Sequence, residues 1–211
     1  WSAPTVRPLP TRLTVRVWTC RVPQGSSAPE YGGLPMRFPI DAAELVTTIG
    51  AGAADYFASV SHGALRLGFE SGGDVMMTID DGPQQCVAHA RAGTVPGEVV
   101  LAVADAEHAA DQPGGFGVAG DASTAGAAYI GANDVADPST PPPLDLVEHE
   151  LGHALGWVHS GDDGTAEVSG RYRCATDVMS DSAAPRSVDA TRRDGPDTLA
   201  IDRYLVGWIP R

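Results

Sequence analysis

The chain has 211 residues, of which 43% are hydrophobic and 19% are charged, and its formal net charge is −13 at pH 7. This length and composition are typical of a folded globular protein with a sizeable core. The negative charge excludes a basic surface for nucleic-acid phosphates or anionic lipids, and no apolar run is long enough for a membrane span. We therefore expect neither nucleic acid nor a membrane as a partner.

The predicted elements of the N-terminal half are, in chain order, a strand, a helix, two short strands, a second helix and a buried strand, at residues 13–20, 41–63, 64–70, 74–80, 84–93 and 97–105. The first helix carries apolar residues at three- and four-residue steps, with Asp41 as its cap and Gly63 as its stop. Gly72 and Gly73 separate the two short strands.

The C-terminal half is less regular. Residues 106–143 are mostly Gly, Ala, Asp and Pro, and their strand candidates are 114–121 and 126–134. A helix is expected at 140–156, and a loop follows it. The last helix is expected at 195–210, with Asp197 as its cap and the core-facing residues Leu199, Ile201, Leu205 and Trp208.

This order of elements predicts an α+β fold in one domain that covers residues 1–211. The change from regular to loop-rich sequence near His159 divides the domain into an N-terminal lobe, residues 1–159, and a smaller C-terminal lobe, residues 160–211. We expect a monomer.

Three cysteines, Cys20, Cys86 and Cys174, lie too far apart in the sequence for a CxxC metal site. One disulfide with one spare thiol is typical of an exported protein, and the sequence leaves all three pairings open. Three reduced cysteines in the core are an equal alternative.

The segment "VEHELGHALGWVHSG" contains three of the six histidines in the chain. Residues four apart lie on one face of a helix, so His149 and His153 can bind the same cation. Glu150 is turned away from the metal but can reach a bound water. Gly156 permits the positive φ of a sharp turn, after which the chain can return His159 as a third ligand.

Three neutral imidazoles and one water form the open tetrahedral site that is typical of catalytic zinc. Zinc lowers the pKa of that water toward about 7, and a nearby carboxylate can accept its proton. Two alternatives are a different divalent ion in the same site and a helix whose histidines are solvated or packed in the core.

The motif in "HELGHALGWVH" resembles the HExxHxxGxxH signature of the metzincin zinc endopeptidases. The resemblance implies that His149, His153 and His159 bind zinc and that Glu150 is the general base. It also implies that Met179, which is 20 residues after His159, lies in a Met-turn under the metal. The implied fold has a twisted, mostly parallel sheet, two helices, an active-site helix and a C-terminal lobe that ends in a helix.

Other segments resemble the immune inhibitor A and gametolysin-like branch of the metzincins. They are "DYFASVSHGALRL", the Tyr-led "YRCATDVMS" and the final "LAIDRYLVGWI". Asp181 stands where astacins and serralysins usually carry a tyrosine, so a switchable tyrosine ligand is absent from that position.

Weaker candidates lie around this motif. Tyr172 is a candidate to stabilise an oxyanion or contact substrate, and packing is its alternative role. Asp162 and Asp163 are candidates to bind Ca²⁺ or to orient His159, and a solvated turn is the alternative. Residues 114–120 are a candidate edge strand for an extended substrate.

The sequence thus favours a secreted, zinc-dependent endopeptidase that hydrolyses extended protein or peptide substrates. Zinc is the expected cofactor. Calcium is an unsupported possibility, for which Asp134 and Asp137 are weaker candidates than Asp162 and Asp163. The alternative from another functional class is a zinc-containing module that binds proteins or glycoproteins without cleaving them.

Overall fold

The computed structural model describes residues 9–32, 35–109, 114–121, 123–131, 143–159, 176–180, 187–188 and 193–208. Within these residues, five strands form one mixed sheet, in the order β2-β1-β3-β5-β4. The strands are β1 (Arg12–Arg21), β2 (Arg66–Met76), β3 (Val99–Ala104), β4 (Gly115–Val118) and β5 (Gly126–Gly131). Only the edge strand β4 is antiparallel to its neighbour. The expected mixed α and β content and mostly parallel sheet are confirmed.

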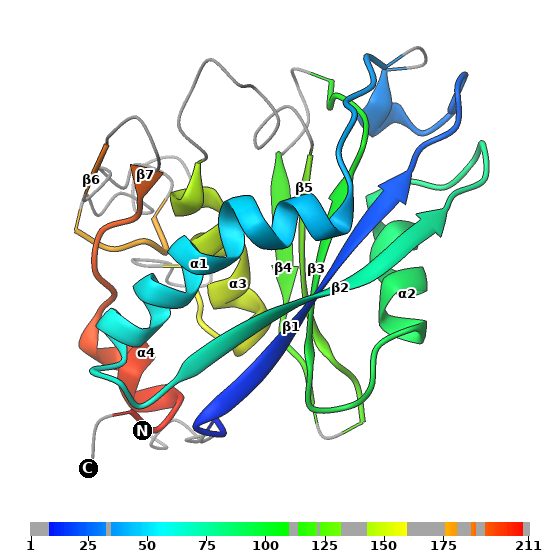
Figure 1. Ribbon diagram of the computed structural model, residues 1–211. Coiled ribbons are helices and arrows are strands. Elements are labelled where there is room, and N and C mark those ends of the chain that lie inside the picture. Colours follow the sequence, from blue (N-terminus) through cyan, green and yellow to red (C-terminus); the bar gives the residue numbers. More distant parts are fainter. Residues whose placement is uncertain are drawn as a thin grey trace, which may run out of the picture.

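Helices cover both faces of this sheet (Figure 1). Helices α1 (Ala42–Val60) and α3 (Leu144–Leu155) share one hydrophobic core with one face of the sheet. Helix α2 (Pro83–Ala92) packs on the opposite face in a second core. The parallel strands β1, β2 and β3 are joined through α1 and α2, as a crossover connection requires.

Helix α1 begins and ends as its sequence predicts. The Asp41 carboxylate accepts a hydrogen bond from the backbone N–H of Glu44, 2.8 Å away. At the other end, Gly63 has a φ of +80° and its N–H donates to the carbonyl of Ala58. The cap and the stop are therefore both confirmed.

The prediction of two short strands around Gly72 and Gly73 is wrong, because β2 runs unbroken through both glycines. The register of β2 against β1 shifts between Val17 and Trp18, opposite these glycines. A Cβ at Gly72 would lie 2.3 Å from the Trp18 indole. Gly72 therefore makes room for a large side chain on the neighbouring strand and does not end its own strand.

A disulfide joins Cys20 on β1 to Cys86 on α2, and the spare Cys174 lies outside the described residues. Both half-cystines are fully buried. The bond fixes α2 to the sheet face that it covers and closes a loop with a sequence separation of 66 residues.

We expect the double variant Cys20→Ala/Cys86→Ala to unfold with a free energy about 2–4 kcal/mol lower than that of the parent protein, because its unfolded chain is no longer cross-linked. Urea unfolding under oxidising conditions measures this loss. Dithiothreitol should destabilise the parent protein by a similar amount and leave the double variant unchanged. A variant as stable as the parent would contradict a structural role for this bond.

The C-terminal part differs from its prediction. The described segments include the short antiparallel pair β6 (Ser187–Val188) and β7 (Arg193–Asp194), and α4 (Ala200–Leu205). The predicted cap is wrong, because the side chain of Asp197 accepts hydrogen bonds from Thr198 and Arg203 while α4 begins after Leu199. Leu199 and Ile201 are exposed. Their predicted core positions are wrong.

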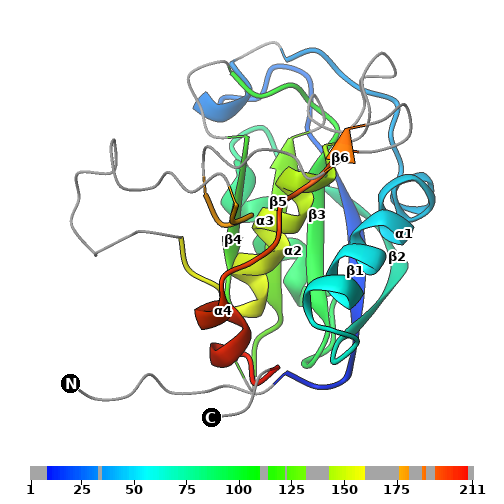
Figure 2. The same cartoon turned by 90° about the vertical axis from the view of Figure 1, so that its left-hand side faces the viewer.

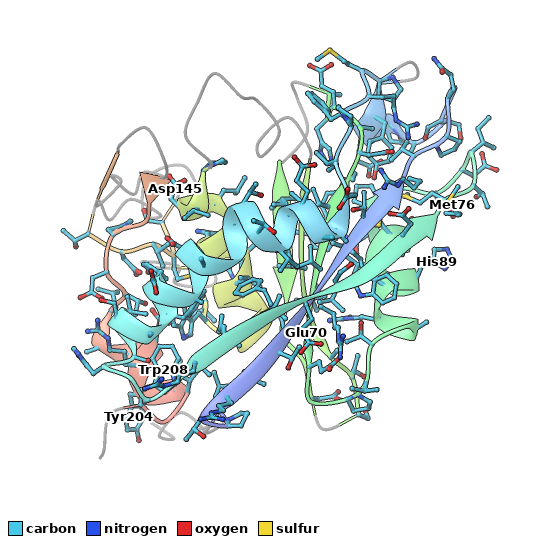
Figure 3. All side chains as sticks on the ribbon, viewed as in Figure 1. Glu70, Met76, His89, Asp145, Tyr204 and Trp208 are labelled. Carbon is cyan, nitrogen blue, oxygen red and sulfur yellow. A yellow bond between two sulfur atoms is a disulfide. The ribbon has the colours of Figure 1, made fainter. Side chains whose placement is uncertain are left out.

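Instead, Asp202 and Val206 are the buried residues between Leu199 and Trp208. Trp208 is half-buried and lies beside α4, and its ring packs edge-on against that of Trp157 (Figure 3). No helix in the described part of the chain has the length and apolar character needed to cross a membrane.

Candidate metal centre

Helix α3 lies directly against the edge of the sheet formed by β4 and β5 (Figure 2). Glycines make this close approach feasible. A Cβ at Gly117 would lie 2.3 Å from the Cβ of His153, and a Cβ at Gly126 would lie 2.2 Å from the carbonyl oxygen of Ala154. Because neither strand position has room for a side chain, the glycine-rich sequence of β4 and β5 positions the histidine-bearing helix.

The three histidines of the motif converge as their spacing predicts. His149 and His153 lie one turn apart on α3, which ends at Gly156 with a φ of +100°. The chain turns there and brings His159 back, so that its Nε2 is 2.8 Å from the Nε2 of His153. One nitrogen from each of the three rings lies within 4.8 Å of the others. All three side chains are half-buried.

Backbone carbonyls fix the orientation of two of these rings. The carbonyl oxygen of Val178 lies 2.7 Å from Nδ1 of His149, and that of Trp157 lies 3.0 Å from Nδ1 of His153. A carbonyl only accepts hydrogen bonds, so each Nδ1 must carry the proton. In the neutral form of each ring, Nε2 then keeps its lone pair, which is the arrangement that a histidine needs to ligate a metal.

Burial also favours the neutral form of a ligand. Desolvation lowers the pKa of His153, and the neighbouring His159 adds to this effect. A neutral imidazole is the species that binds a divalent cation. The donor set, its mutual distances and its protonation therefore fit one metal ion held by His149, His153 and His159.

Glu150 lies beside these histidines on the sheet-facing side of α3. Its side chain is buried, and a Cβ at Gly115 of β4 would lie 2.8 Å from its Oε1. Among the described residues, its Oε2 has no hydrogen-bond partner. Desolvation raises the pKa of Glu150 to about 8. A cation nearby opposes this shift because it stabilises the carboxylate.

Met179 lies under α3, in a turn formed by residues 176–180 and called here the Met179 turn. The Asp177 carboxylate accepts a hydrogen bond from the Met179 N–H at 3.1 Å. Met179 is fully buried, and a Cβ at Gly152 would lie 2.6 Å from its sulfur. The sulfur therefore packs against the helix backbone between His149 and His153.

Several sequence candidates lie outside the described residues. They are Tyr172, Asp162, Asp163 and Cys174. The oxyanion role of Tyr172 and the calcium role of the aspartate pair stay predictions, and so does the lobe formed by residues 160–211.

The sequence interpretation did not single out two buried carboxyl groups next to the site. Glu148 is fully buried and its Oε2 accepts a hydrogen bond from the Gly195 N–H at 2.6 Å. Asp202 is 1% exposed and accepts a hydrogen bond from the Thr198 hydroxyl at 3.1 Å. Glu148 falls on the same helical face as Gly152, four residues on, which was the available signal for its burial.

Burial raises the pKa of Asp202 to about 7, and the charge of Asp177 contributes further. A carboxyl group with a raised pKa in the folded state destabilises that state as it ionises, so the free energy of unfolding falls between about pH 4 and pH 7. We expect Asp202→Asn to remove this dependence. Relative to the parent, the variant should gain about 1–3 kcal/mol between pH 5 and pH 8. Urea unfolding at both pH values, with chelator present, measures the gain. If the free energies of unfolding of variant and parent differ by the same amount at pH 5 and at pH 8, the raised pKa of Asp202 is contradicted.

No protein-family model matches the sequence, and no curated protein matches it either. Among solved structures, archaemetzincin from Methanopyrus kandleri has a similar fold, with a TM-score of 0.51 and 15% identity over 93% of this chain and 94% of that one. Metalloproteinase-II from Bacteroides fragilis is 13% identical, with a TM-score of 0.45, over 99% of this chain and 56% of its own length.

At such low identity the similarity concerns the fold alone. The mixed sheet and its helices form a fold similar to that of archaemetzincin. The assignment to the immune inhibitor A and gametolysin-like branch stays a prediction.

Proposed function

We propose that this protein is a zinc-dependent endopeptidase of the metzincin type. One observation carries the proposal: three half-buried histidines converge within 4.8 Å next to a buried glutamate, and backbone carbonyls orient the rings of His149 and His153 through Nδ1. A structural zinc site is usually closed by four protein ligands, whereas a three-histidine set leaves a position for water or substrate. The similarity of the fold to that of archaemetzincin supports the same assignment.

In the proposed mechanism, His149, His153 and His159 would hold the ion, which would supply Lewis acidity toward a carbonyl and lower the pKa of a water. The Glu150 carboxylate would accept a proton from the attacking water and pass it to the leaving amine. Its burial between α3 and Gly115 keeps bulk water away from that proton. Met179 contributes an apolar floor that holds the histidine-bearing helix in place.

Substrate would bind along the edge strand β4. This strand pairs with β5 on one side, and the described residues include no strand on its other side. Its glycines face α3, while the ring of Phe116 stacks on Tyr129 on the opposite face of the sheet. Among the described residues, this backbone edge lies beside α3 and is not covered by another strand, which suits an extended peptide that adds as a further strand. This supports a protein or peptide substrate.

We further propose that the protein is secreted and monomeric, with an N-terminal lobe of residues 1–159 and a C-terminal lobe of residues 160–211. The Cys20–Cys86 disulfide supports secretion, because such bonds persist mainly in oxidising compartments. Placement in the immune inhibitor A and gametolysin-like branch belongs to this proposal too, on the sequence segments that resemble it.

Incubation with a peptide library, with and without a chelator, tests the function. We expect cleavage at internal peptide bonds that stops when zinc is removed and returns when zinc is added. Zinc binding without any cleavage would reject the peptidase and favour the zinc-containing binding module.

A further inference from the structure

We propose that Glu148 is a positioning residue for the metal centre, acting on His149 through a buried junction with Gly195 and Val178. These three residues are called the Gly195 junction. The inference rests on the proposed metal centre and adds a role for a carboxylate that is not itself a ligand. Glu148 directly precedes His149 in α3, and its side chain is wholly buried.

The first contact of the junction joins the active-site helix to the C-terminal segment. Oε2 of Glu148 accepts the Gly195 N–H at 2.6 Å, although the two residues are 47 positions apart in the sequence. A hydrogen bond from a backbone N–H to a buried carboxylate is charge-assisted and stronger than a neutral one. Removal of the carboxylate would leave a buried N–H without this acceptor, at a cost of about 1–3 kcal/mol.

The second contact shows that the junction has no free space. A Cβ at Gly195 would lie 2.8 Å from Oε2 of Glu148 and 2.7 Å from Cγ2 of Val178. Gly195 is therefore enclosed between the helix and the Met179 turn. A side chain there would push the two apart.

The third contact leads from the junction to the metal ligand. The Val178 N–H donates to the carbonyl of Asp197 at 3.0 Å, and its own carbonyl accepts from Nδ1 of His149 at 2.7 Å. His149 is thus fixed at two points. Its backbone is joined to that of Glu148, and its ring is hydrogen-bonded to the carbonyl of Val178. Because Gly195 contacts both residues, the junction sets the position of the His149 imidazole relative to His153.

Neighbouring contacts reinforce the junction. The Tyr56 hydroxyl, from α1, donates to the carbonyl of Pro196 at 2.8 Å. The C-terminal segment that begins at Gly195 is therefore held from the core side as well. Outer-shell groups that orient a ligand typically change metal affinity by about 10- to 100-fold when they are removed.

Four variants of the full chain test this role: Glu148→Ala removes the acceptor, Glu148→Gln keeps an acceptor oxygen, Gly195→Ala adds a methyl group, and Asp105→Asn is the control. Asp105 is also a buried carboxyl group that directly follows β3, but it is bonded to the Val22 N–H and paired with Arg37, which are not part of the metal centre or the Gly195 junction. Zinc affinity is measured by competition with a chromophoric chelator, and stability by urea unfolding of the metal-free protein.

We expect Glu148→Ala and Gly195→Ala to weaken zinc binding by about 10- to 100-fold, with an altered visible spectrum of the Co²⁺-substituted protein. Glu148→Gln should recover most of the affinity. Asp105→Asn should lose stability without losing zinc affinity. If Glu148→Ala and Gly195→Ala lose stability but bind zinc as the parent does, the junction is only structural and the inference is overturned.

Gly195→Ala and Glu148→Gln keep the test decisive if Glu148→Ala does not fold. A parent protein that binds no zinc would instead reject the proposed metal centre. The two failures are therefore distinguishable.

Discussion

Replacement of Glu150 with glutamine is expected to lower kcat for peptide cleavage by about 10²- to 10⁴-fold, which is the usual contribution of a general base. Glutamine has nearly the same shape but cannot accept the proton. Zinc should stay bound at one equivalent, because the proposed ligands are the three converging histidines and Glu150 is not a ligand. The measurement is steady-state cleavage of a peptide identified by the library, with zinc content determined on the same sample.

Glu44→Gln is the matched control for this substitution, since Glu44 is an exposed glutamate at the start of α1. It should retain the activity of the parent protein. Full activity of Glu150→Gln with zinc bound would show that another group accepts the proton. Glu150 is buried against Gly115, and glutamine occupies nearly the same volume there, so the variant should also fold normally.

Replacement of His153 with alanine is expected to weaken zinc binding by more than about 100-fold, which exceeds the usual loss on removal of an outer-shell group. His153 supplies one of the three nitrogens, and its Nε2 is 2.8 Å from that of His159. Two remaining imidazoles hold the ion poorly, so activity should fall with zinc content. The measurement is zinc stoichiometry after dialysis against a dilute chelator, together with the chelator-competition affinity.

The control here is His89→Ala. His89 lies on α2, on the opposite face of the sheet from α3, and its side chain is 53% exposed (Figure 3). This variant should keep one equivalent of zinc. Equal zinc retention by His153→Ala would contradict the three-histidine site.

The sequence predicts those parts of the fold that depend on local patterns. The cap at Asp41, the stop at Gly63 and the end of α3 at Gly156 are set by neighbouring backbone groups, and all three occur as expected. Gly72 and Gly73 were misread because a glycine pair usually marks a turn. Whether Gly72 ends a strand depends on the Trp18 indole of β1, which is distant in the sequence.

At the site, too, features set by neighbouring residues are predictable from the sequence, and features set by distant residues are not. His149, His153 and His159 lie within eleven residues, so helix geometry and one glycine turn account for their convergence. Glu148 meets Gly195 only because the chain returns to α3 after the Met179 turn, and no local pattern encodes that return. Asp202 was also missed, because no local pattern encodes its burial near Asp177, which lies in another segment.

Titration of the metal-free protein with zinc, while cleavage of one internally cut peptide is followed, tests whether this protein is a zinc-dependent endopeptidase. We expect activity to rise linearly and to stop rising at one equivalent of zinc, and we expect chelator to reverse the gain. Cleavage that is already complete without zinc would contradict this proposal, and so would one bound equivalent of zinc with no cleavage.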